Sequence, residues 1–338
     1  MKNLIYLLTT LAFLTACNSS HEKKDMNSAA DQSFDRYKNN FIEDLWKLYP
    51  GWASSVGYHK YDSVLVIPSM AFHQMEISFA KAHLDSLKSF HAEELSANNR
   101  TDYSMIENAL KGIEWGVNDM KDFQWNPASW NVGGGFGEML NGTYDVLENR
   151  LRNMYKRMDN VSTYYEVAKK NIINPTAEHT QLGIDQNLGS VDIFEKDFPD
   201  SVNACSKIPD AEKADMIKRS KVCAESIRDY ANWLKNLKNP SPRSFRLGKE
   251  LYAKKFEYDI QSGYTPETIY QKALERKSIL HQEMMKITTQ LWKKYFDAKA
   301  MPSDSLVAIK MMIDNLSAKH VHRDSFQLAI EKIGRAHV

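Results

Sequence analysis

TPETIYQKALERKSILHQEMMKITTQLWKKYF, residues 265–296, carries the clearest helical pattern of the sequence. Thr265 suits the capping position, Pro266 suits the first helical position, and Glu267 faces the positive end of the helix dipole. Apolar residues follow in steps of three, four and seven, which place them on one face of a helix: Ile269, Ala273, Leu280, Met284, Ile287 and Leu291. The pattern predicts one long amphipathic helix over 266–296.

Helical patterning also occurs throughout the sequence before this stretch and in one segment after it. We predict further helices at 31–48, 70–95, 102–121, 138–158, 162–173, 176–198, 210–237, 244–258 and 304–316. Thr101-Asp102 and Asp210 suit the starts of two of them, and only Ser63 to Ile67 alternates as a short strand does. We therefore expect an all-α, multi-helix array, with more than half of the residues in helices and under about a tenth in strands.

The N-terminus has the features of a secretory signal peptide, residues 1–17. Lys2 precedes an apolar run from Leu4 to Leu14 that falls short of the roughly 20 residues needed to span a bilayer. The sequence Leu-Thr-Ala-Cys that ends at Cys17 resembles a bacterial lipobox, in which the cysteine thiol takes the lipid. We predict a lipid anchor at Cys17; the alternative is ordinary signal cleavage with Cys17 incidental.

The residues after Cys17 indicate where the mature protein would reside. Residue 18 is Asn rather than Asp, so in a bacterium with two membranes we expect the outer membrane. Residues 18–32 are polar, without periodicity, and are predicted to form a flexible tether. The predicted location is the bacterial cell envelope, with the membrane as a partner through the lipid.

The overall composition excludes two classes of protein. Of 338 residues, 43% are hydrophobic and 26% are charged, which is typical of a globular chain and not of a disordered one. Lys and Arg number 44 and Asp and Glu number 43, and removal of Lys2 with the signal peptide leaves 43 of each sign. Because nucleic-acid binding proteins usually carry a basic excess, we expect no nucleic-acid partner.

Two cysteines remain beyond the predicted anchor, Cys205 and Cys223. An oxidising envelope permits a disulfide between them. A continuous helix from Asp210 would, however, place Cys223 roughly 20 Å along its axis, a distance that the intervening residues span only when fully extended. We predict two buried free thiols, with the disulfide as the alternative.

Motifs that identify common catalytic or metal sites are absent from the sequence. There is no HExxH, GxSxG, GxxxxGK[ST], CxxC or GxGxxG. His73 and Glu76 are three residues apart and could share a helix face, and we interpret them as a surface pair rather than as metal ligands. We therefore assign no catalytic residue, no metal ligand and no cofactor to this chain.

One loop is distinguished by its composition. Trp125 and Trp130 precede a run of three glycines, Gly133, Gly134 and Gly135, at the start of a predicted helix. One interpretation is a substrate-facing lip with stacking aromatic rings. The alternative, which we favour, is that the indoles pack between helices while the glycines permit a tight chain entry.

Several stretches resemble one bacterial family. FIEDLWKLYPGWASSVGYHKYD, residues 41–62, resembles the opening of domain-of-unknown-function family 885, in which a helix ends at a proline and a Tyr-Asp pair closes the unit. Residues 150–199 are similar to its central helices, and FRLGKELY, 245–252, with YTPETIY, 264–270, is similar to its later signature. Its members are often envelope lipoproteins and resemble helical zinc metallopeptidases with a HExxPGH-type motif.

The sequence departs from that family where the zinc motif is expected, because no such motif occurs in it. IGRAHV, residues 333–338, resembles translated sequencing-adapter read-through. We therefore expect residues 33–332 to be an incomplete helical domain, the N-terminal part of a larger metallopeptidase-like fold. Zinc is expected in the full-length parent only.

Two functions remain open at this stage. The resemblance implies a lipid-anchored envelope zinc peptidase, of which this chain would form helical walls of a cleft for peptide substrates. The alternative is a non-catalytic envelope lipoprotein that binds a peptide, a glycan or a protein partner. For the chain alone we expect neither tight zinc binding nor peptide hydrolysis.

Overall fold

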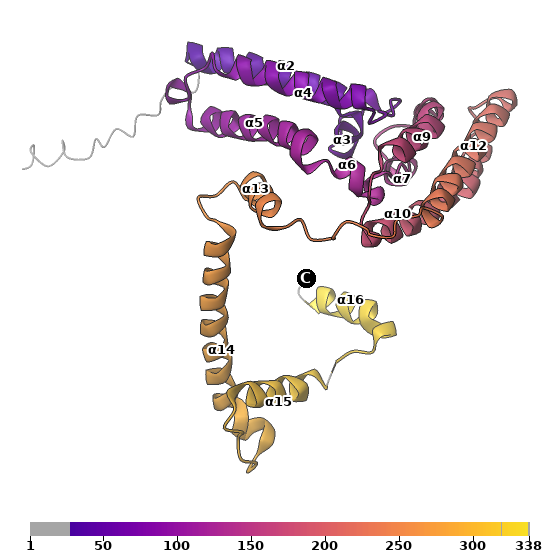
Figure 1. Cartoon of the computed structure of the whole chain (residues 1–338). Helices are drawn as coiled ribbons and strands as arrows, with labels where there is room; N and C mark the ends of the chain where they lie inside the picture. Colours follow the sequence, from indigo (N-terminus) through magenta and orange to yellow (C-terminus); the bar gives the residue numbers. More distant parts are fainter. Residues whose placement is uncertain (1–27, 319, 337–338) are drawn as a thin grey trace, which may run out of the picture. The chain divides into compact units, whose positions relative to one another are not determined.

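The computed structural model describes residues 28–318 and 320–336 (Figure 1). Helices make up 77% of the structure, and the described residues contain no strand, only one isolated bridge between Thr176 and Arg243. The predicted all-α, multi-helix array is therefore confirmed. The predicted signal peptide, Cys17 and residues 18–27 of the predicted tether lie outside the described residues.

The helices follow one another with short connections. In chain order they are α2 Ala29–Leu48, α3 Pro50–Ser55, α4 Met70–Leu87, α5 Ala97–Trp115, α6 Asp122–Trp125, α7 Gly133–Asn141, α8 Leu147–Arg157, α9 Val161–Asn171, α10 Ala177–Gly189, α11 Phe198–Ala204, α12 Asp210–Lys235, α13 Lys249–Ile260, α14 Pro266–Phe296, α15 Ser305–Ser317 and α16 Phe326–Ala336. Single 3-10 turns include η1 His59–Tyr61, and π-helical turns follow α5 and precede α11. None of the described helices is both long and apolar enough to cross a membrane.

The described chain divides into two compact units at Tyr252 and Ala253, where the sequence predicted a single domain over 33–332. The division falls within α13, which buries none of its side chains. A helix without buried residues contributes little to the core of either unit.

In unit 1, α2, α4 and α5 lie side by side (Figure 1). Their shared core contains Phe34, Phe41, Leu45, Ala80, Leu87, Leu95, Ile106 and Leu110. Helix α2 begins at Ala29, before the predicted end of the tether at residue 32, because Ser28 caps it and the Asp31 carboxylate is anchored. Asp31 accepts hydrogen bonds from the Ser96 N–H at 2.9 Å and the Asn99 amide at 2.7 Å, which join α2 to the start of α5.

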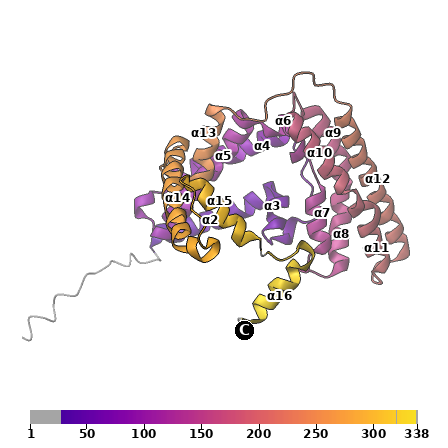
Figure 2. The same ribbon diagram turned by 90° about the horizontal axis from the view of Figure 1, so that it is seen from below.

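A second group of helices, α7 to α12, lies in the same unit (Figure 2). Helix α12 lines its core with Met216, Cys223, Ile227, Tyr230 and Leu234. The thiols of Cys205 and Cys223 are both buried and free, as the helix geometry predicted.

Several helix boundaries differ from the predicted ones. The helix predicted over 138–158 is two helices, α7 and α8, because the Arg150 guanidinium donates to the carbonyls of Met139 and Leu140 and so ends α7. Helix α5 begins at Ala97 with Ser96 as its cap, and not at Thr101-Asp102. Residues 63–67 form no strand. The helix predicted over 176–198 is shorter in the structure, where α10 ends at Gly189. A separate π-helical turn, Ile193–Asp197, follows it.

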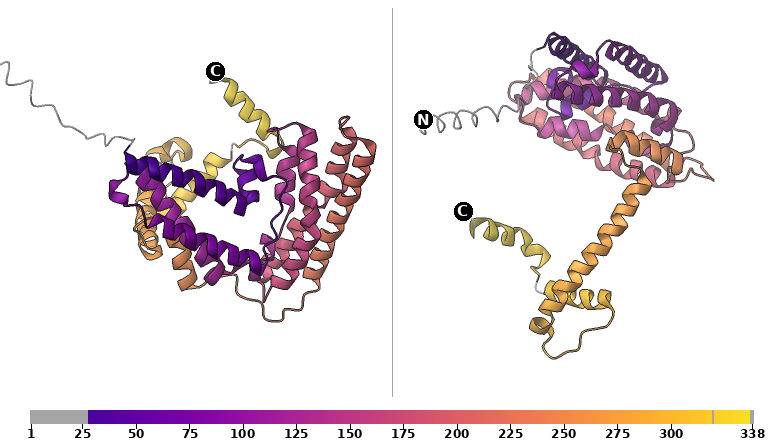
Figure 3. Two further views of the ribbon diagram at one scale, coloured as in Figure 1. Left: turned by 90° about the horizontal axis from the view of Figure 1, so that it is seen from above. Right: turned by 90° about the vertical axis from the view of Figure 1, so that its left-hand side faces the viewer.

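Unit 2 contains the helix predicted first, α14, as one uninterrupted helix (Figure 3). Thr265 accepts a hydrogen bond from the Thr268 N–H at 3.2 Å, as a capping residue does. Helix α14 packs on α15 around Trp292, Ala308 and Met312. Much of its predicted apolar face stays exposed, including Ile269, Leu280, Met284 and Ile287. Residues 333–336 belong to α16. That residues 333–338 come from translated adapter sequence stays a prediction.

Candidate functional site

A tight turn after α3 places the polar side chains of GYHKYD, residues 57–62. Gly57 has a φ of 88°, a conformation that few other residues adopt without strain. Its N–H donates to the Ser54 carbonyl at 3.0 Å, and the next N–H donates to the Ala53 carbonyl at 2.8 Å. The turn of η1 follows at once, so the side chains of residues 58–62 separate onto two sides.

On one side the turn is held by Glu43 of α2. The carboxylate accepts hydrogen bonds from the Tyr58 hydroxyl at 2.5 Å, from the Lys60 ammonium at 2.5 Å and from the Tyr61 hydroxyl. These donors, Lys60 first, lower the pKa of Glu43 from 4.5 to about 2. The turn is therefore anchored to α2 through an ionised carboxylate.

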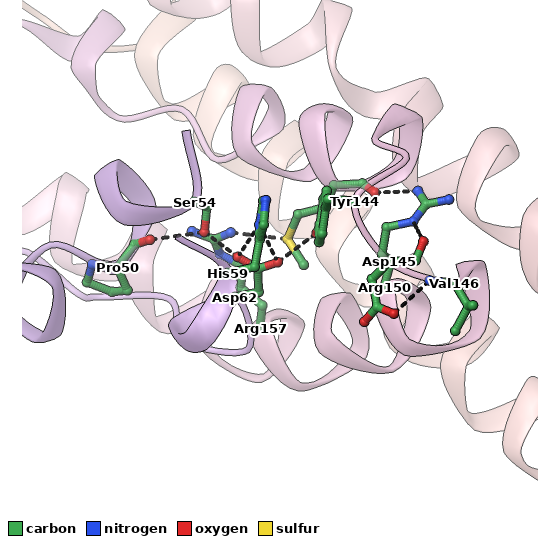
Figure 4. Close-up of polar contacts among 10 residues, drawn as sticks. Pro50, Ser54, His59, Asp62, Tyr144, Asp145, Val146, Arg150 and Arg157 are labelled. Atoms are coloured by element: carbon green, nitrogen blue, oxygen red, sulfur yellow. Dashed lines mark hydrogen bonds and ion pairs between the residues drawn. The ribbon is translucent and has the colours of Figure 1, made fainter. Parts of the chain in front are cut away.

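On the other side Asp62 is the centre of a buried cluster (Figure 4). Its side chain has no exposed surface. The Ser54 hydroxyl lies 2.5 Å from Oδ1, the Tyr144 hydroxyl lies 2.6 Å from Oδ2, and the His59 Nδ1 lies 3.1 Å from Oδ2. Three donors around one carboxylate supply the partners that a buried charge requires.

His59 and Tyr144 form the outer edge of this cluster. Their rings stack with centroids 3.4 Å apart and planes 2° from parallel. The His59 side chain is 28% exposed and the Tyr144 residue is 37% exposed. Burial, followed by the hydrogen bond to Asp62, raises the pKa of Tyr144. His59 faces the Asp62 carboxylate with Nδ1, so Nε2 lies on the opposite edge of the ring.

Arg157, at the end of α8, supplies the positive charge of the cluster and is only 5% exposed. Its Nη1 lies 3.2 Å from the Met139 sulfur, and its guanidinium carbon lies 5.9 Å from the Phe136 ring centroid. Burial lowers the pKa of Arg157, and the charge of Asp62 is the largest opposing influence. No acidic side chain of the described residues lies within ion-pair distance of this guanidinium.

Arg150 fixes the segment that carries Tyr144. Besides the two carbonyls at the end of α7, its Nε donates to the Asp145 carbonyl at 3.1 Å. Arg150 therefore serves the backbone and leaves Arg157 as the charged group of the cluster (Figure 4).

The residues predicted for a substrate-facing loop separate in the structure. Trp125 and Trp130 are 6% and 2% exposed, and their indole N–H groups donate to the carbonyls of Met120 and Phe123. The burial favours the packing interpretation over a lip of exposed aromatic rings.

The three glycines of the same loop have three different surroundings. Gly133 packs against Ser190, so that a Cβ there would lie 2.2 Å from the serine Cβ. Gly134 is exposed, with nothing within 4 Å of a Cβ, whereas Gly135 lies beside the Arg157 guanidinium. Only Gly135, of the five residues predicted for the loop, is thus brought to the Asp62 cluster.

The prediction of a surface pair at His73 and Glu76 is wrong, since both residues are buried. The His73 Nδ1 lies 2.6 Å from Glu76 Oε2, and the Tyr49 hydroxyl donates to Oε1 at 2.6 Å. The His73 ring stacks on Phe123, with ring centroids 3.9 Å apart. Within the core Glu76 thus accepts from both Tyr49 and His73, whereas the buried His73 Nε2 has no hydrogen-bond partner among the described residues.

The described residues do not fit a zinc ion. No group of three or more His, Cys, Asp or Glu side chains that could hold a metal occurs within 28–318 and 320–336. Zinc sites in proteins need at least three such ligands. No step of chemistry through zinc is therefore assigned to this chain.

Sequence reasoning did not single out His59, Asp62, Tyr144 or Arg157. The only signal was the Tyr-Asp pair within 41–62, which marked the resemblance to the family and no role. Tyr144 lies 82 positions beyond Asp62 and carries no pattern of its own.

Together the fold and the cluster define an all-α protein with a buried carboxylate, an imidazole and an arginine in one polar site. The model of the family described as bacterial protein of unknown function (DUF885) matches residues 50–336, and the chain belongs to this family. No curated protein shows significant similarity to the chain.

A solved structure from Shewanella oneidensis, described as that of a "putative lipoprotein of unknown function", is also similar. It is 41% identical in sequence, with a TM-score of 0.81 over 88% of this chain. The chain spans 55% of the length of that protein.

Proposed function

We propose that this chain is the N-terminal portion of a lipid-anchored cell-envelope protein related to zinc metallopeptidases. The observation that carries the proposal is the 41% identity over 88% of the chain with a protein described as a lipoprotein. The lipobox-like ending at Cys17 supports the anchor, and Asn18 supports an outer-membrane location. The metallopeptidase relation rests on the family resemblance.

Within such a protein, the described helices would form part of the wall of a peptide-binding cleft. The Asp62 cluster supports this role because a buried carboxylate holds the imidazole of His59 with Nε2 directed away from it. Zinc and the catalytic glutamate would come from a HExxH segment that this sequence does not contain.

The anchor is tested by Cys17→Ala in the full chain expressed in a bacterium. We expect wild-type protein in the membrane fraction with incorporated fatty acid, and the variant in the soluble fraction without it. Cys223→Ala serves as the control, because its thiol is buried and should not affect the location. Equal membrane retention and labelling of the Cys17 variant would refute the anchor.

The peptidase relation is tested by zinc content and peptide turnover, measured side by side on this chain and on the protein encoded by the extended reading frame. We expect metal-dependent turnover only from the extended protein. An extended frame without HExxH, or an extended protein without turnover, would favour a non-catalytic binding lipoprotein. The binding lipoprotein is retained as a second candidate because the described residues contain no group of three or more side chains that could hold a metal.

A further inference from the structure

The start of α7 and the guanidinium of Arg157 converge on one small region of unit 1. Helix α7 has nine residues and begins with three glycines. The Gly133 N–H donates to the Asn131 side chain at 2.8 Å. The N–H groups of Gly134 and Gly135 belong to the first turn, where a helix provides no acceptor, and no acceptor for them occurs among the described residues. Two N–H groups at the positive end of a helix dipole are therefore available.

Arg157 is an independent sign of a ligand at the same place. A guanidinium that is 5% exposed usually has a carboxylate partner, because an unpaired buried charge is costly. Here the guanidinium donates to the Met139 thioether at 3.2 Å, which is a weak acceptor. No ion pair between Asp62 and Arg157 occurs among the described residues, and the Asp62 oxygens accept from Ser54, His59 and Tyr144 instead.

Two glycines lie directly against the guanidinium. A Cβ at Gly135 would lie 3.8 Å from Nη1 and 3.9 Å from Nη2, and a Cβ at Gly51 would lie 3.4 Å from Nη2. Gly51 and Gly134 are exposed and Gly135 is half-exposed. Because no side chain stands on these glycines, only backbone separates this side of the guanidinium from the exposed start of α7.

The charge of the region selects the kind of anion. One guanidinium and two N–H groups match a planar, singly charged carboxylate, which arginine binds with two parallel hydrogen bonds. A doubly charged phosphate is disfavoured, because the ionisable Asp62 belongs to the same cluster (Figure 4).

We propose that Arg157 and the N–H groups of Gly134 and Gly135 bind the C-terminal carboxylate of a peptide. The choice of a peptide rests on the proposed function, whereas the preference for a carboxylate rests on the site alone. His59 Nε2 and the Tyr144 ring lie at the outer edge of the Asp62 cluster, where the residues before that carboxylate can contact them.

The test is calorimetric titration of the full chain with two N-acetylated pentapeptides of one sequence, one ending in a free carboxylate and one in an amide. We expect at least tenfold weaker binding of the amide, and a comparable loss for the acid with Arg157→Met. Arg152→Met is the matched control on α8, because Arg152 is paired with Glu148 and Glu212 at the surface. Binding of the acid to this control should be unchanged.

A second pair of variants avoids the buried core. Gly134 is exposed and a side chain there meets nothing within 4 Å, so Gly134→Asp and Gly134→Asn are both expected to fold. The aspartate variant should weaken binding of the acid at least fivefold relative to the asparagine variant, because its carboxylate competes at the helix start. Equal binding to these two variants, or equal binding of acid and amide to the wild type, would overturn the site.

Further outcomes separate this site from the proposed function. Phosphate that binds more tightly than acetate would refute the carboxylate preference. Acid-selective binding without peptide turnover by the extended protein would support the site and contradict the peptidase. Turnover with no acid selectivity would support the peptidase and contradict the site.

Discussion

Tyr144→Phe removes one oxygen from the buried cluster and provides the sharpest test of its energetics. The hydroxyl donates to Asp62 Oδ2 at 2.6 Å, and the Asp62 side chain has no exposed surface. A hydrogen bond to a charged group contributes roughly 1.5 to 3 kcal/mol. Since the stacked ring is retained and water cannot readily replace the lost donor, we expect a loss of about 2 kcal/mol in the free energy of unfolding.

The assay is urea denaturation followed by tryptophan fluorescence. All tryptophans except Trp292 lie in unit 1, so the signal reports the unit that contains the cluster. The two units need not unfold together. Both are helical, so circular dichroism follows both, and its comparison with the fluorescence signal separates the two transitions. Tyr58→Phe is the matched control, because the same atom is removed from a bond to the more exposed Glu43. We expect a smaller loss for this control.

A double-mutant cycle identifies the partner. In the background of Asp62→Asn, the substitution Tyr144→Phe should cost clearly less than in the wild type, because the hydroxyl no longer meets a charged acceptor. A loss below about 0.5 kcal/mol in the wild type, or an equal loss in both backgrounds, would refute the view that this bond stabilises a buried carboxylate.

Three further predictions concern other parts of unit 1. Gly133→Ala should lower the urea midpoint strongly, since the new Cβ would lie 2.2 Å from the Ser190 Cβ. Gly134→Ala should leave the urea midpoint equal or raise it, because nothing lies within 4 Å of a Cβ there. The reverse order of the two midpoints would contradict the packing of α7. Hydrogen bonds to the Asp31 carboxylate, above all the one from the Ser96 backbone N–H at the start of α5, lower the pKa of Asp31 from 3.8 to about 2. The ionised Asp31 carboxylate therefore stabilises the fold fully above its pKa in the unfolded chain, and this stabilisation is lost as the pH falls through its pKa in the folded protein. The difference in unfolding free energy between wild type and Asp31→Asn should shrink from about pH 4 to pH 2. A difference that stays constant with pH would contradict the lowered pKa of Asp31. Burial raises the pKa of Cys223 to about 12. In Cys17→Ala/Cys205→Ala protein, where Cys223 is the one remaining thiol, its reaction with a thiol reagent at pH 8 should be far slower in the native protein than in urea, and equal rates would contradict its burial.

Periodicity in the sequence was sufficient for the long helices and insufficient for their ends and for short helices such as α3 and α6. The helix over 266–296 was predicted with its cap, because Thr265 and Pro266 act through local geometry alone. The break between α7 and α8 depends on Arg150, which reaches back to carbonyls ten and eleven positions earlier. A side chain that ends a helix at this distance leaves no mark in the spacing of apolar residues.

Burial of polar groups was the other property that the pattern could not reveal. His73 and Glu76 are typical surface residues by type, and their spacing fits either location. Their burial is decided by Tyr49 and Phe123, which arrive from other elements of unit 1. The same holds for Arg157, whose surroundings of Gly51 and Gly135 come from segments far apart in the chain.

The turn over 57–62 shows why a short stretch can mark a family and still hide its role. Residues 58, 60 and 61 bind Glu43, whereas residues 59 and 62 belong to the buried cluster with Tyr144. Apolar contacts could join the same elements, but they would not orient an imidazole ring. The contact with the Asp62 carboxylate holds the His59 ring in position, since a rotation of the ring would remove one partner from a buried acidic group. The polar character of this turn is therefore better explained by the orientation of His59 than by stability alone.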